Sequence, residues 1–361
     1  MTEGESRIPL FVLGGGGMLA GELLRLAELH PRLEVRAVST RDVARTKAVH
    51  AHVAPAGPGP LASEEEALDI LVTSLVAGER AAVFLGLPHG QSADTVARIL
   101  ERTKGHDDGL TLVDLSADFR LEDPDLYAAT YGRPHPRPEL LGTFVYGLPE
   151  LRKFSLEGAR RIAAPGCFAT ALQLAVVPAA RGGLLDARRP WILHGITGSS
   201  GSGTEPAPGT HHPHRHGNLW AYGLTGHRHE AELRQAIAPL GVDPVLHFLP
   251  HSGPFVRGIH LTATLPLARS VSTEECHEVF AAAYEGRPFV RVLEGRVPDL
   301  RSVAGSNTAC LAVSVRGEVL TVLCTLDNIV KGGAGQGLQC LNLAEGWPET
   351  WGLPRSGLGA C

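Results

Sequence analysis

The amino-acid sequence predicts an α/β protein of two domains, the first built on a doubly wound parallel sheet and the second on an antiparallel or mixed sheet. Three observations support this. The chain has 361 residues, of which 43% are hydrophobic and 20% charged, which is enough for two ordinary globular domains. Short apolar runs alternate with helical stretches in the first third of the chain. From about residue 190 onward the pattern changes, and apolar and polar residues alternate over 258–267.

The first third contains the elements of repeated strand–helix–strand units. Helices are expected at 22–29, where the sequence ELLRLAEL has helical spacing, and at 92–102. Buried strands are expected in four short apolar runs, at 8–13, 33–38, 81–87 and 110–115. Strands separated by helices pair in parallel, so these segments predict a parallel sheet.

The second half of the chain reads as antiparallel strands. Residues 258–267 place Ile259, Leu261 and Ala263 on one face and polar side chains on the other, as in a half-buried strand. Residues 311–326 read as two strands joined at Arg316 and Gly317. A helix over 335–343 is expected to return to the first domain. We therefore expect a first domain over 1–165, completed by about 331–361, and a second over 166–330.

Charge and cysteine content narrow the class of protein. The formal net charge is −5 and there is no long run of Lys or Arg, which argues against nucleic acid or an anionic membrane as the main partner. The N-terminal segment has neither the pattern of a secretory signal nor the length of a membrane span. The six cysteines are scattered without a CxxC pair, which favours reduced thiols in a cytoplasmic enzyme.

A glycine-rich loop separates the first expected strand from the first expected helix. In GGGGMLAGELL (14–24), Gly14, Gly17 and Ala20 follow a G-x-x-G-x-x-G/A spacing. Such glycines allow a tight turn in which backbone N–H groups and a helix N-terminus approach a pyrophosphate. The alternative is a flexible turn, but the strand before the loop and the helix after it favour a Rossmann dinucleotide site.

The end of the second expected strand indicates which dinucleotide binds. NAD-binding domains usually have Asp or Glu there, whereas this strand continues into Ser39, Thr40 and Arg41. Two hydroxyls and a guanidinium suit a 2′-phosphate, and an acidic residue would repel it. Asp42 follows Arg41, and its negative charge weakens the prediction that a 2′-phosphate binds here. We expect NADP.

Cys167 lies in APGCFAT (164–170), directly before a stretch that is apolar almost all round (168–180) and is expected to form a buried helix. A thiol at a helix N-terminus has a lowered pKa, and the thiolate is the reactive form. A small buried apolar residue is the alternative for Cys167, since free cysteines are often simply buried.

A thiolate needs a proton partner, and GHRHEAELRQ (226–235) supplies two histidines near an expected helix start. Residues two apart do not share a helix face, so His227 is assigned the acid/base role. His229 is expected to support it by bonding Glu232. The alternative is a pair of surface histidines.

Three further features are candidates for binding anions. HHPHRH (211–216) lacks ligand spacing typical of a metal site, so we expect no metal and a polar loop with a cationic role towards substrate. GSSGSG (198–203) is either a linker or an anion-binding loop. Arg120 and Arg257 either bind anions or serve as structural cations.

Taken together, these motifs resemble the N-acetyl-γ-glutamyl-phosphate reductase family, which is related to aspartate-semialdehyde dehydrogenase. The resemblance spans nearly the whole chain and is carried by eight stretches, LGGGGMLAGELLRL (13–26), VFLGLPHGQSA (83–93), VDLSADFRL (113–121), VYGLPEL (145–151), PGCFAT (165–170), GHRHEAEL (226–233), FLPHSGPFVRGI (248–259) and LDNIVKGGAGQGLQCLNL (326–343).

The resemblance implies a site and a reaction. Cys167 would be the nucleophile and His227 the acid/base residue, with His229 close by. NADPH-dependent reduction of N-acetyl-γ-glutamyl phosphate to the semialdehyde, through a cysteine thioester, would serve arginine biosynthesis. Arg120, Ser199, Gly201 and Arg257 are expected to bind substrate. The cofactor is expected to contact Gly14, Gly16, Gly17, Met18, Leu19, Ser39, Arg41, Leu87, Pro88, His89, Asn328, Gly332 and Gln336.

The chain also departs from the usual family pattern. GGGGMLA stands where the family commonly has GASGYTG, APGCFAT stands for NPGCYPT, and residues 209–222 differ as well. These differences leave the acyl group open, with aminoadipyl phosphate on a small acidic carrier protein in lysine biosynthesis as the alternative substrate. Aspartyl phosphate as the substrate, or a non-catalytic dinucleotide-binding protein, are further alternatives. A homo-oligomer, either a dimer or a tetramer, is also expected.

Overall fold

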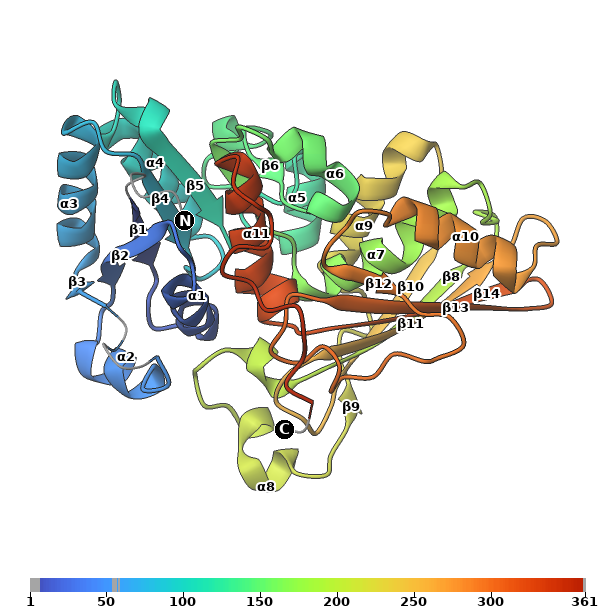
Figure 1. Ribbon diagram of the computed structural model, residues 1–361. Helices are drawn as coiled ribbons and strands as arrows, with labels where there is room; N and C mark the ends of the chain where they lie inside the picture. The colour runs from blue at the N-terminus through green and yellow to red at the C-terminus, as the bar shows by residue number, and fades with distance from the viewer. Residues whose placement is uncertain (1–6, 54–56, 58, 360–361) are drawn as a thin grey trace. The chain divides into compact units, whose positions relative to one another are not determined.

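The computed structural model describes residues 7–53, 57 and 59–359, which form two compact units (Figure 1). The first unit comprises the described residues up to Pro165 together with Gly333–Leu353. The second comprises Gly166–Gly332 and the described residues from Pro354 onward. The tail that we expected to complete the first domain is therefore divided between the two units.

The first unit is a seven-stranded sheet in which every neighbouring pair is parallel. Its spatial order is β3-β2-β1-β4-β5-β7-β6, so the strand order reverses between β1 and β4. The strands are β1 Ile8–Leu13, β2 Leu33–Ser39, β3 Leu61–Ala62, β4 Ala81–Leu85, β5 Leu110–Asp114, β6 Val145–Tyr146 and β7 Arg161–Ala163. The helices are α1 Met18–Glu28, α2 Val43–Val49, α3 Glu64–Val76, α4 Ser92–Arg102, α5 Pro124–Tyr131, α6 Pro149–Leu156 and α11 Gly335–Ala344, with 3-10 turns at Asp107–Gly109 and Pro138–Leu140.

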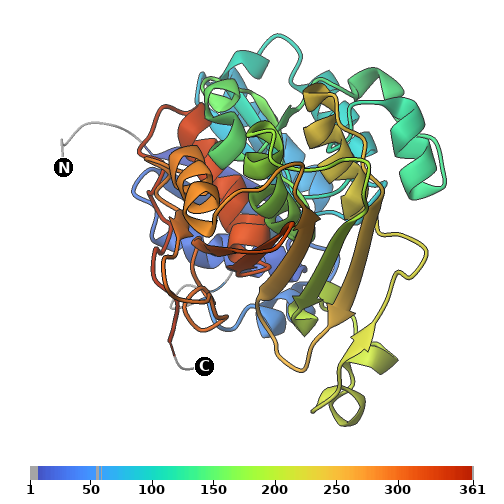
Figure 2. The same cartoon turned by 90° about the vertical axis from the view of Figure 1, so that its right-hand side faces the viewer.

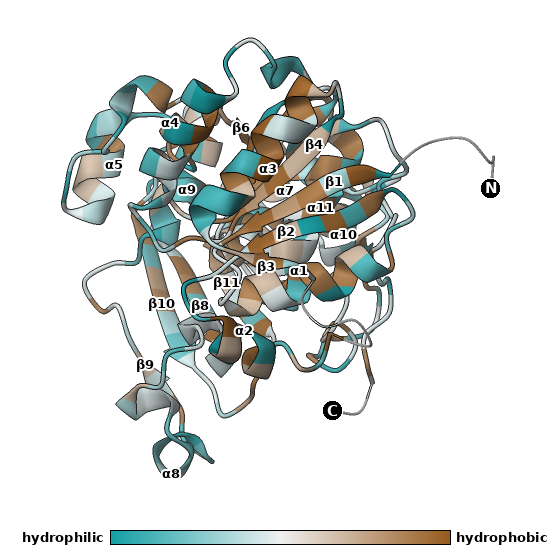
Figure 3. Cartoon of the chain, turned by 90° about the vertical axis from the view of Figure 1, so that its left-hand side faces the viewer, coloured by the Kyte–Doolittle hydropathy of each residue, from teal (hydrophilic) through white to brown (hydrophobic). Residues whose placement is uncertain are grey.

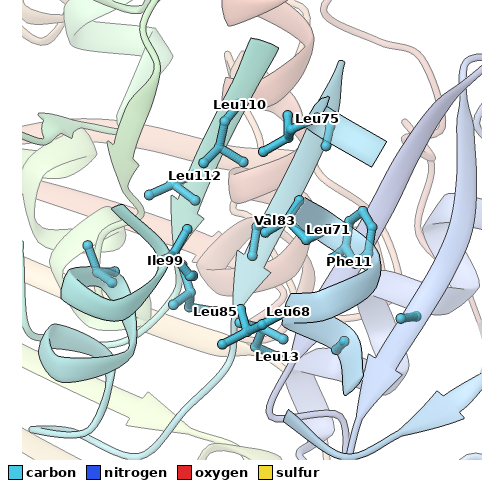
Figure 4. Close-up of a cluster of buried hydrophobic side chains, with 14 of the residues drawn as sticks. Phe11, Leu13, Leu68, Leu71, Leu75, Val83, Leu85, Ile99, Leu110 and Leu112 are labelled. Carbon is cyan, nitrogen blue, oxygen red and sulfur yellow. The ribbon is translucent and has the colours of Figure 1, made fainter. Parts of the chain in front are cut away.

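The three central strands β1, β4 and β5 are buried along their whole length, as a parallel sheet covered on both faces requires. Figure 3 shows β1 and β4 mostly in the white-to-brown, hydrophobic part of the colour scale. Phe11 and Leu13 of β1 and Val83 and Leu85 of β4 pack in one cluster (Figure 4) with helix and strand side chains that include Leu68, Leu71, Leu75, Ile99, Leu110 and Leu112.

The second unit is built on a mixed sheet of order β12-β13-β14-β11-β8-β10-β9. The pairs β8/β10 and β12/β13 are parallel and the others antiparallel. Its strands are β8 Trp191–Thr197, β9 Trp220–Ala221, β10 Leu246–Ser252, β11 Ile259–Pro266, β12 Val290–Val292, β13 Ala309–Arg316 and β14 Val319–Leu326. Its helices are α7 Cys167–Arg181, α8 His212–Arg215, α9 His229–Ile237 and α10 Thr273–Ala283, with 3-10 turns at Ser199–Ser202, Pro208–Thr210 and Ala238–Leu240; a π-helical turn, Val330–Ala334, crosses the boundary between the units.

Helix α7 is the core of the second unit. Every residue from Phe168 to Ala180 is buried, because α7 packs against β11, β14, α9 and α10. Figure 2 shows α7 and α10 on one face of the sheet. Alternate residues of β8, β10 and β11 are buried against this layer, whereas those between them are at least partly exposed. The helix thus anchors its first residue, Cys167, at the edge of a tightly packed layer.

The predicted fold class is confirmed: a parallel Rossmann-type sheet is followed by a mixed sheet. The strand predicted at 81–87 ends earlier, at Leu85, and the two-strand hairpin turns at Gly317 and Glu318. The predicted loop at 211–216 contains the short helix α8. In the described part of the chain, no helix combines the length and the apolar character needed to cross a membrane.

Candidate functional site

The glycine loop after β1 requires glycine at its first position. Gly14 has a φ of +87°, and a Cβ there would lie 2.7 Å from the carbonyl oxygen of Gly86. The loop is also fixed to the end of β2, since the Gly14 N–H donates to Ser39 Oγ at 3.1 Å and the Gly15 N–H donates to the Ser39 carbonyl at 2.7 Å. Ser39 is buried, so its hydroxyl shapes the loop.

Helix α1 begins directly after this loop with a free N-terminus. Gly17 is its N-cap and provides no side-chain hydrogen bond, and there is no acidic residue in the first turn. Met18 is exposed and Leu19 half-buried. A helix N-terminus of this kind attracts anions through its N–H groups and dipole. The described residues of this loop therefore fit the pyrophosphate of a dinucleotide.

Residues beyond β2 provide an exposed cation. Arg41 is exposed and its Nη2 donates to Gln91 Oε1 at 3.3 Å. Asp42, which weakened the prediction of NADP, has a structural role: its carboxylate caps α2 by accepting the Arg45 N–H at 2.9 Å. The Asp42 carboxylate is therefore engaged in capping α2.

The turn after β4 carries Leu87, Pro88 and His89, and a buried carboxylate holds it. Asp118 Oδ1 lies 2.7 Å from His89 Nδ1 and accepts the Gly90 N–H at 2.7 Å, while Oδ2 accepts the Ala93 N–H at 3.0 Å. Burial opposes ionisation of Asp118, but these hydrogen bonds outweigh it and lower the pKa of the carboxyl. Since β1 and β4 are neighbours at the reversal of strand order, this turn and the glycine loop share the carboxyl edge where such sheets bind ligands.

Two other residues predicted for the site support the backbone of the first unit. Arg120 is buried, and its guanidinium donates to the carbonyls of Ala164 and Leu115 at 2.9 and 3.0 Å. Gln336 is fully buried and donates from Nε2 to the Gly147 carbonyl at 2.9 Å.

The second unit contains a pocket of about 320 Å³ that Cys167 lines as the first residue of α7. The thiol is partly exposed, in contrast to the other four cysteines in the described part of the chain, which are buried. Burial raises the pKa of the Cys276, Cys310 and Cys324 thiols. Besides Cys167, the pocket is lined by Phe168, Thr197, Gly201, Ser202, Ala207, Gly209, Thr210, Trp220, Tyr222, His227, Arg228, His229 and Ser252.

Close packing fixes the backbone on both sides of Cys167. A Cβ on Gly166 would lie 2.3 Å from His229 Nε2, so the imidazole of His229 rests against this glycine. The buried Glu232 accepts the Gly166 N–H at 3.1 Å, and a Cβ on Gly332 would lie 2.6 Å from the Cβ of Cys167. Gly332 thus packs against the thiol residue, and Glu232 holds the turn that precedes it.

His227 lies in the same pocket in an environment that keeps it neutral. Burial, followed by the charge of Arg228, lowers the pKa of His227 to about 4. Its Nδ1 accepts the His229 N–H at 3.3 Å, so the neutral ring carries its proton on Nε2. The ring centroid lies 4.6 Å from that of His229 and 5.9 Å from that of Tyr222. Burial, and the charge of Cys167, raise the pKa of Tyr222.

The segment 198–203 is neither a linker nor an open anion cradle. The N–H groups of Gly198, Ser199 and Ser200 donate to the carbonyls of residues 258, 255 and 256, at 2.9, 2.9 and 3.0 Å. They are therefore not available to an anion. Gly201 still lines the pocket.

Arg257 and Asn328, two other predicted residues, also have partners within the second unit. Arg257 Nε donates to Asp327 Oδ2 at 2.9 Å. The Asn328 side chain accepts the Gly258 N–H at 2.7 Å and donates to Ser200 Oγ at 2.9 Å.

The histidine-rich segment 211–216 is mostly exposed, but Arg215 within it is buried. Among the described residues, no group of three or more His, Cys, Asp or Glu side chains is arranged to hold a metal ion.

The lining residues that the sequence did not assign to the site include Thr197, Trp220, Tyr222 and Ser252. Thr197 and Ser252 end the neighbouring parallel strands β8 and β10 and are register partners. The signal that could have found them is a hydroxyl at the end of each of two apolar strands, but β10 itself was not predicted.

Two family models match the chain. The semialdehyde dehydrogenase NAD binding domain matches residues 10–159, and the semialdehyde dehydrogenase dimerisation domain matches residues 167–328. The expectation of a nicotinamide-dinucleotide enzyme is thereby confirmed.

Curated relatives match over almost their entire length. The [LysW]-L-2-aminoadipate 6-phosphate reductase of Deinococcus radiodurans is 38% identical, covering 96% of this chain and 97% of the relative. The N-acetyl-gamma-glutamyl-phosphate reductase of Synechococcus elongatus is 36% identical, covering 97% of each. Among solved structures, aspartate semialdehyde dehydrogenase II from Vibrio cholerae has the same fold, with a TM-score of 0.65 at 13% identity over 94% of this chain and 98% of that one.

Proposed function

This chain belongs to the semialdehyde dehydrogenase family, and we propose that it is an NADPH-dependent reductase of an acyl phosphate derived from glutamate or aminoadipate. One observation carries the proposal: a partly exposed thiol begins α7 in a pocket that it shares with two histidines. The thiol is a nucleophile for the acyl carbon, and His227 transfers the proton.

The first unit supplies the residues for the dinucleotide. The loop that begins at Gly14 and the free N-terminus of α1 suit the pyrophosphate, and Arg41 suits the 2′-phosphate of NADP. The adjacent side of this dinucleotide site is formed by the turn Leu87, Pro88 and His89, which Asp118 holds in place. When bound, NADPH supplies the hydride that brings the acyl carbon to the oxidation level of an aldehyde.

Cys167 carries out the covalent step. As a thiolate it attacks the carbonyl carbon of the acyl phosphate, a C–S bond forms, the C–O bond to phosphate breaks, and phosphate leaves with the electron pair. The N–H groups at the start of α7 and the helix dipole stabilise the thiolate and the oxyanion that develops on the carbonyl oxygen.

His227 handles the proton on that oxygen. Because its neutral ring carries the proton on Nε2, it donates to the oxygen that becomes negative when the thioester is reduced. When the thiohemiacetal collapses, the oxygen returns the proton, the C–S bond breaks and the thiolate is restored. His229, packed against Gly166, keeps the turn before Cys167 in place.

Two acyl phosphates are candidates for the substrate. N-Acetyl-γ-glutamyl phosphate is the substrate predicted from the sequence. A carrier-linked aminoadipyl phosphate is the second candidate, favoured by one feature: Gly209 and Thr210 at the pocket lead directly into the exposed histidines of 211–216, a surface suited to an acidic carrier. One methylene separates the two acyl chains and is worth only about 1–3 kcal/mol of discrimination.

The reverse reaction tests the proposal. NADP reduction is measured with N-acetylglutamate semialdehyde or carrier-linked aminoadipate semialdehyde, with and without phosphate. Phosphate-dependent NADPH formation is expected with one of them, and the preferred aldehyde identifies the acyl group. Absence of phosphate-dependent reduction with both aldehydes would contradict the proposal, as would iodoacetamide labelling of Cys167 no faster than that of the other cysteines.

We also propose that the chain forms a homo-oligomer through the second unit. The residues of β8, β10 and β11 that point away from α7 are at least partly exposed along the sheet, which suits pairing with a second copy. Light scattering of the purified chain measures the oligomeric state, and a monomer at micromolar concentration would contradict the proposal.

A further inference from the structure

Thr197 presents a hydroxyl without a partner to the thiol pocket. The residue lines the pocket and is only 7% exposed. Its Oγ1 is buried and makes no hydrogen bond to any other described residue. An unpaired buried hydroxyl is costly, so this atom is suited to a ligand that enters the pocket.

Ser252 lies beside Thr197 and is linked to a cation. The two residues are register partners at the carboxyl ends of β10 and β8, and both line the pocket. Ser252 Oγ accepts a hydrogen bond from Arg215 Nη1 at 2.5 Å. Because its oxygen accepts from Arg215, the Ser252 hydroxyl proton is directed elsewhere, as a donor polarised by the positive charge behind it.

Arg215 is a buried cation without a carboxylate. It is 8% exposed, Nη2 donates to the Gly253 carbonyl, and the guanidinium carbon lies 4.9 Å from the ring centroid of Trp220. Within the described ranges, Arg215 forms no ion pair, and its buried Nε has no hydrogen-bond partner. A buried charge needs compensation, and a bound anion in the pocket would provide it.

We propose that Thr197, Ser252 and Arg215 form an oxyanion wall of the thiol pocket, which binds a carboxylate or phosphate oxygen of the substrate. Thr197 and Ser252 donate to the oxygen, and Arg215 is a positioning residue that acts through Ser252. The proposal rests on the proposed function and deepens it, because an acyl phosphate of this class carries both kinds of oxyanion. The wall determines specificity for charged rather than neutral acyl chains.

Protection of Cys167 from alkylation tests the wall without requiring turnover. The rate of iodoacetamide labelling at Cys167 is followed by mass spectrometry while N-acetylglutamate or inorganic phosphate is added as the probe. For one of these anions, we expect the half-protecting concentration to rise about 10- to 100-fold in Arg215→Gln, because the variant removes the buried positive charge that polarises the Ser252 hydroxyl. Arg215→Lys should recover part of the loss. Arg189→Gln, which changes an exposed arginine of the same unit that pairs with Glu318, should leave protection unchanged.

A matched pair at Thr197 keeps the test valid if Arg215→Gln does not fold. Thr197→Val removes the hydroxyl at nearly constant shape and should raise the same half-protecting concentration about 3- to 10-fold, whereas Thr197→Ser should not. NADPH affinity and the labelling rate without anion should be unchanged in all variants, because a general structural defect would alter both.

The two probes identify the oxyanion. If the variants weaken protection only by N-acetylglutamate, the wall binds a carboxylate of the substrate. If they weaken protection only by phosphate, the wall binds the phosphate leaving group. If neither anion protects the wild type, or if protection is the same in Arg215→Gln and Thr197→Val, the proposal is wrong. If protection depends on Arg215 but neither semialdehyde is turned over, the wall stands and the proposed function fails.

Discussion

The two candidate sites differ in how the chain assembles them. The dinucleotide site of the first unit is built from loops that directly follow β1, β2 and β4, each next to its strand in the sequence. The thiol pocket of the second unit gathers residues from seven segments between Cys167 and Ser252. A motif that is continuous in sequence can be identified before the fold is known, whereas a pocket of scattered residues becomes visible only with the register of its strands.

The largest expected effect tests whether the scattered pocket carries the chemistry. Cys167→Ala should lower kcat at least about 10⁴-fold, since no other described thiol reaches the pocket, while the dissociation constant for NADPH stays the same. Single-turnover assays and fluorescence titration of NADPH measure the two quantities. Cys276→Ala, a change to a buried thiol elsewhere in this unit, should keep its activity, and residual turnover in Cys167→Ala would remove the thioester mechanism.

The second prediction concerns the continuous motif. Gly14→Ala should lower the free energy of unfolding by about 2–5 kcal/mol, because it adds both a positive-φ penalty and a clash with the Gly86 carbonyl. Gly78→Ala is the matched control: its φ is +81° but nothing lies within 4 Å, so only about 1–2 kcal/mol should be lost. Denaturant unfolding measures both. Equal losses would show that close packing of the loop contributes nothing.

His227 gives a pH-dependent prediction for the pocket. Its pKa is about 4 in the folded chain, against 6.5 when unfolded, so the unfolded state binds the proton first as the pH falls. The free energy of unfolding should therefore fall between pH 6.5 and 4, with about 3 kcal/mol due to this residue. His227→Gln should have a correspondingly shallower pH dependence in denaturant titrations. The same slope in both proteins would mean that burial does not keep His227 neutral.

The sequence predicted the parallel sheet because its strands are buried, contiguous and punctuated by helices, and it located the Gly14 loop and Cys167 through their neighbours in the chain. The sequence said little about the roles of side chains whose hydrogen-bond partners are distant in the chain. The guanidiniums of Arg120 and Arg257 looked suited to anions, but they hold a carbonyl pair and Asp327, which no local pattern reveals. The sequence did not single out Arg215 from the histidines of the same segment. Only its burial in the structure distinguishes it from them.

The smallest expected effect tests whether Arg41 distinguishes the two nicotinamide dinucleotides. Since its guanidinium is proposed to meet only the 2′-phosphate, Arg41→Ala should weaken NADPH binding about 10- to 100-fold and leave NADH binding unchanged. Arg36→Ala, which removes a β2 cation 3.4 Å from Glu79, is the control and should affect neither cofactor. Fluorescence titration with both dinucleotides measures the difference. A parallel loss for NADPH and NADH would assign Arg41 to shaping the loop, and the continuous motif would then specify dinucleotide binding without specifying the phosphate.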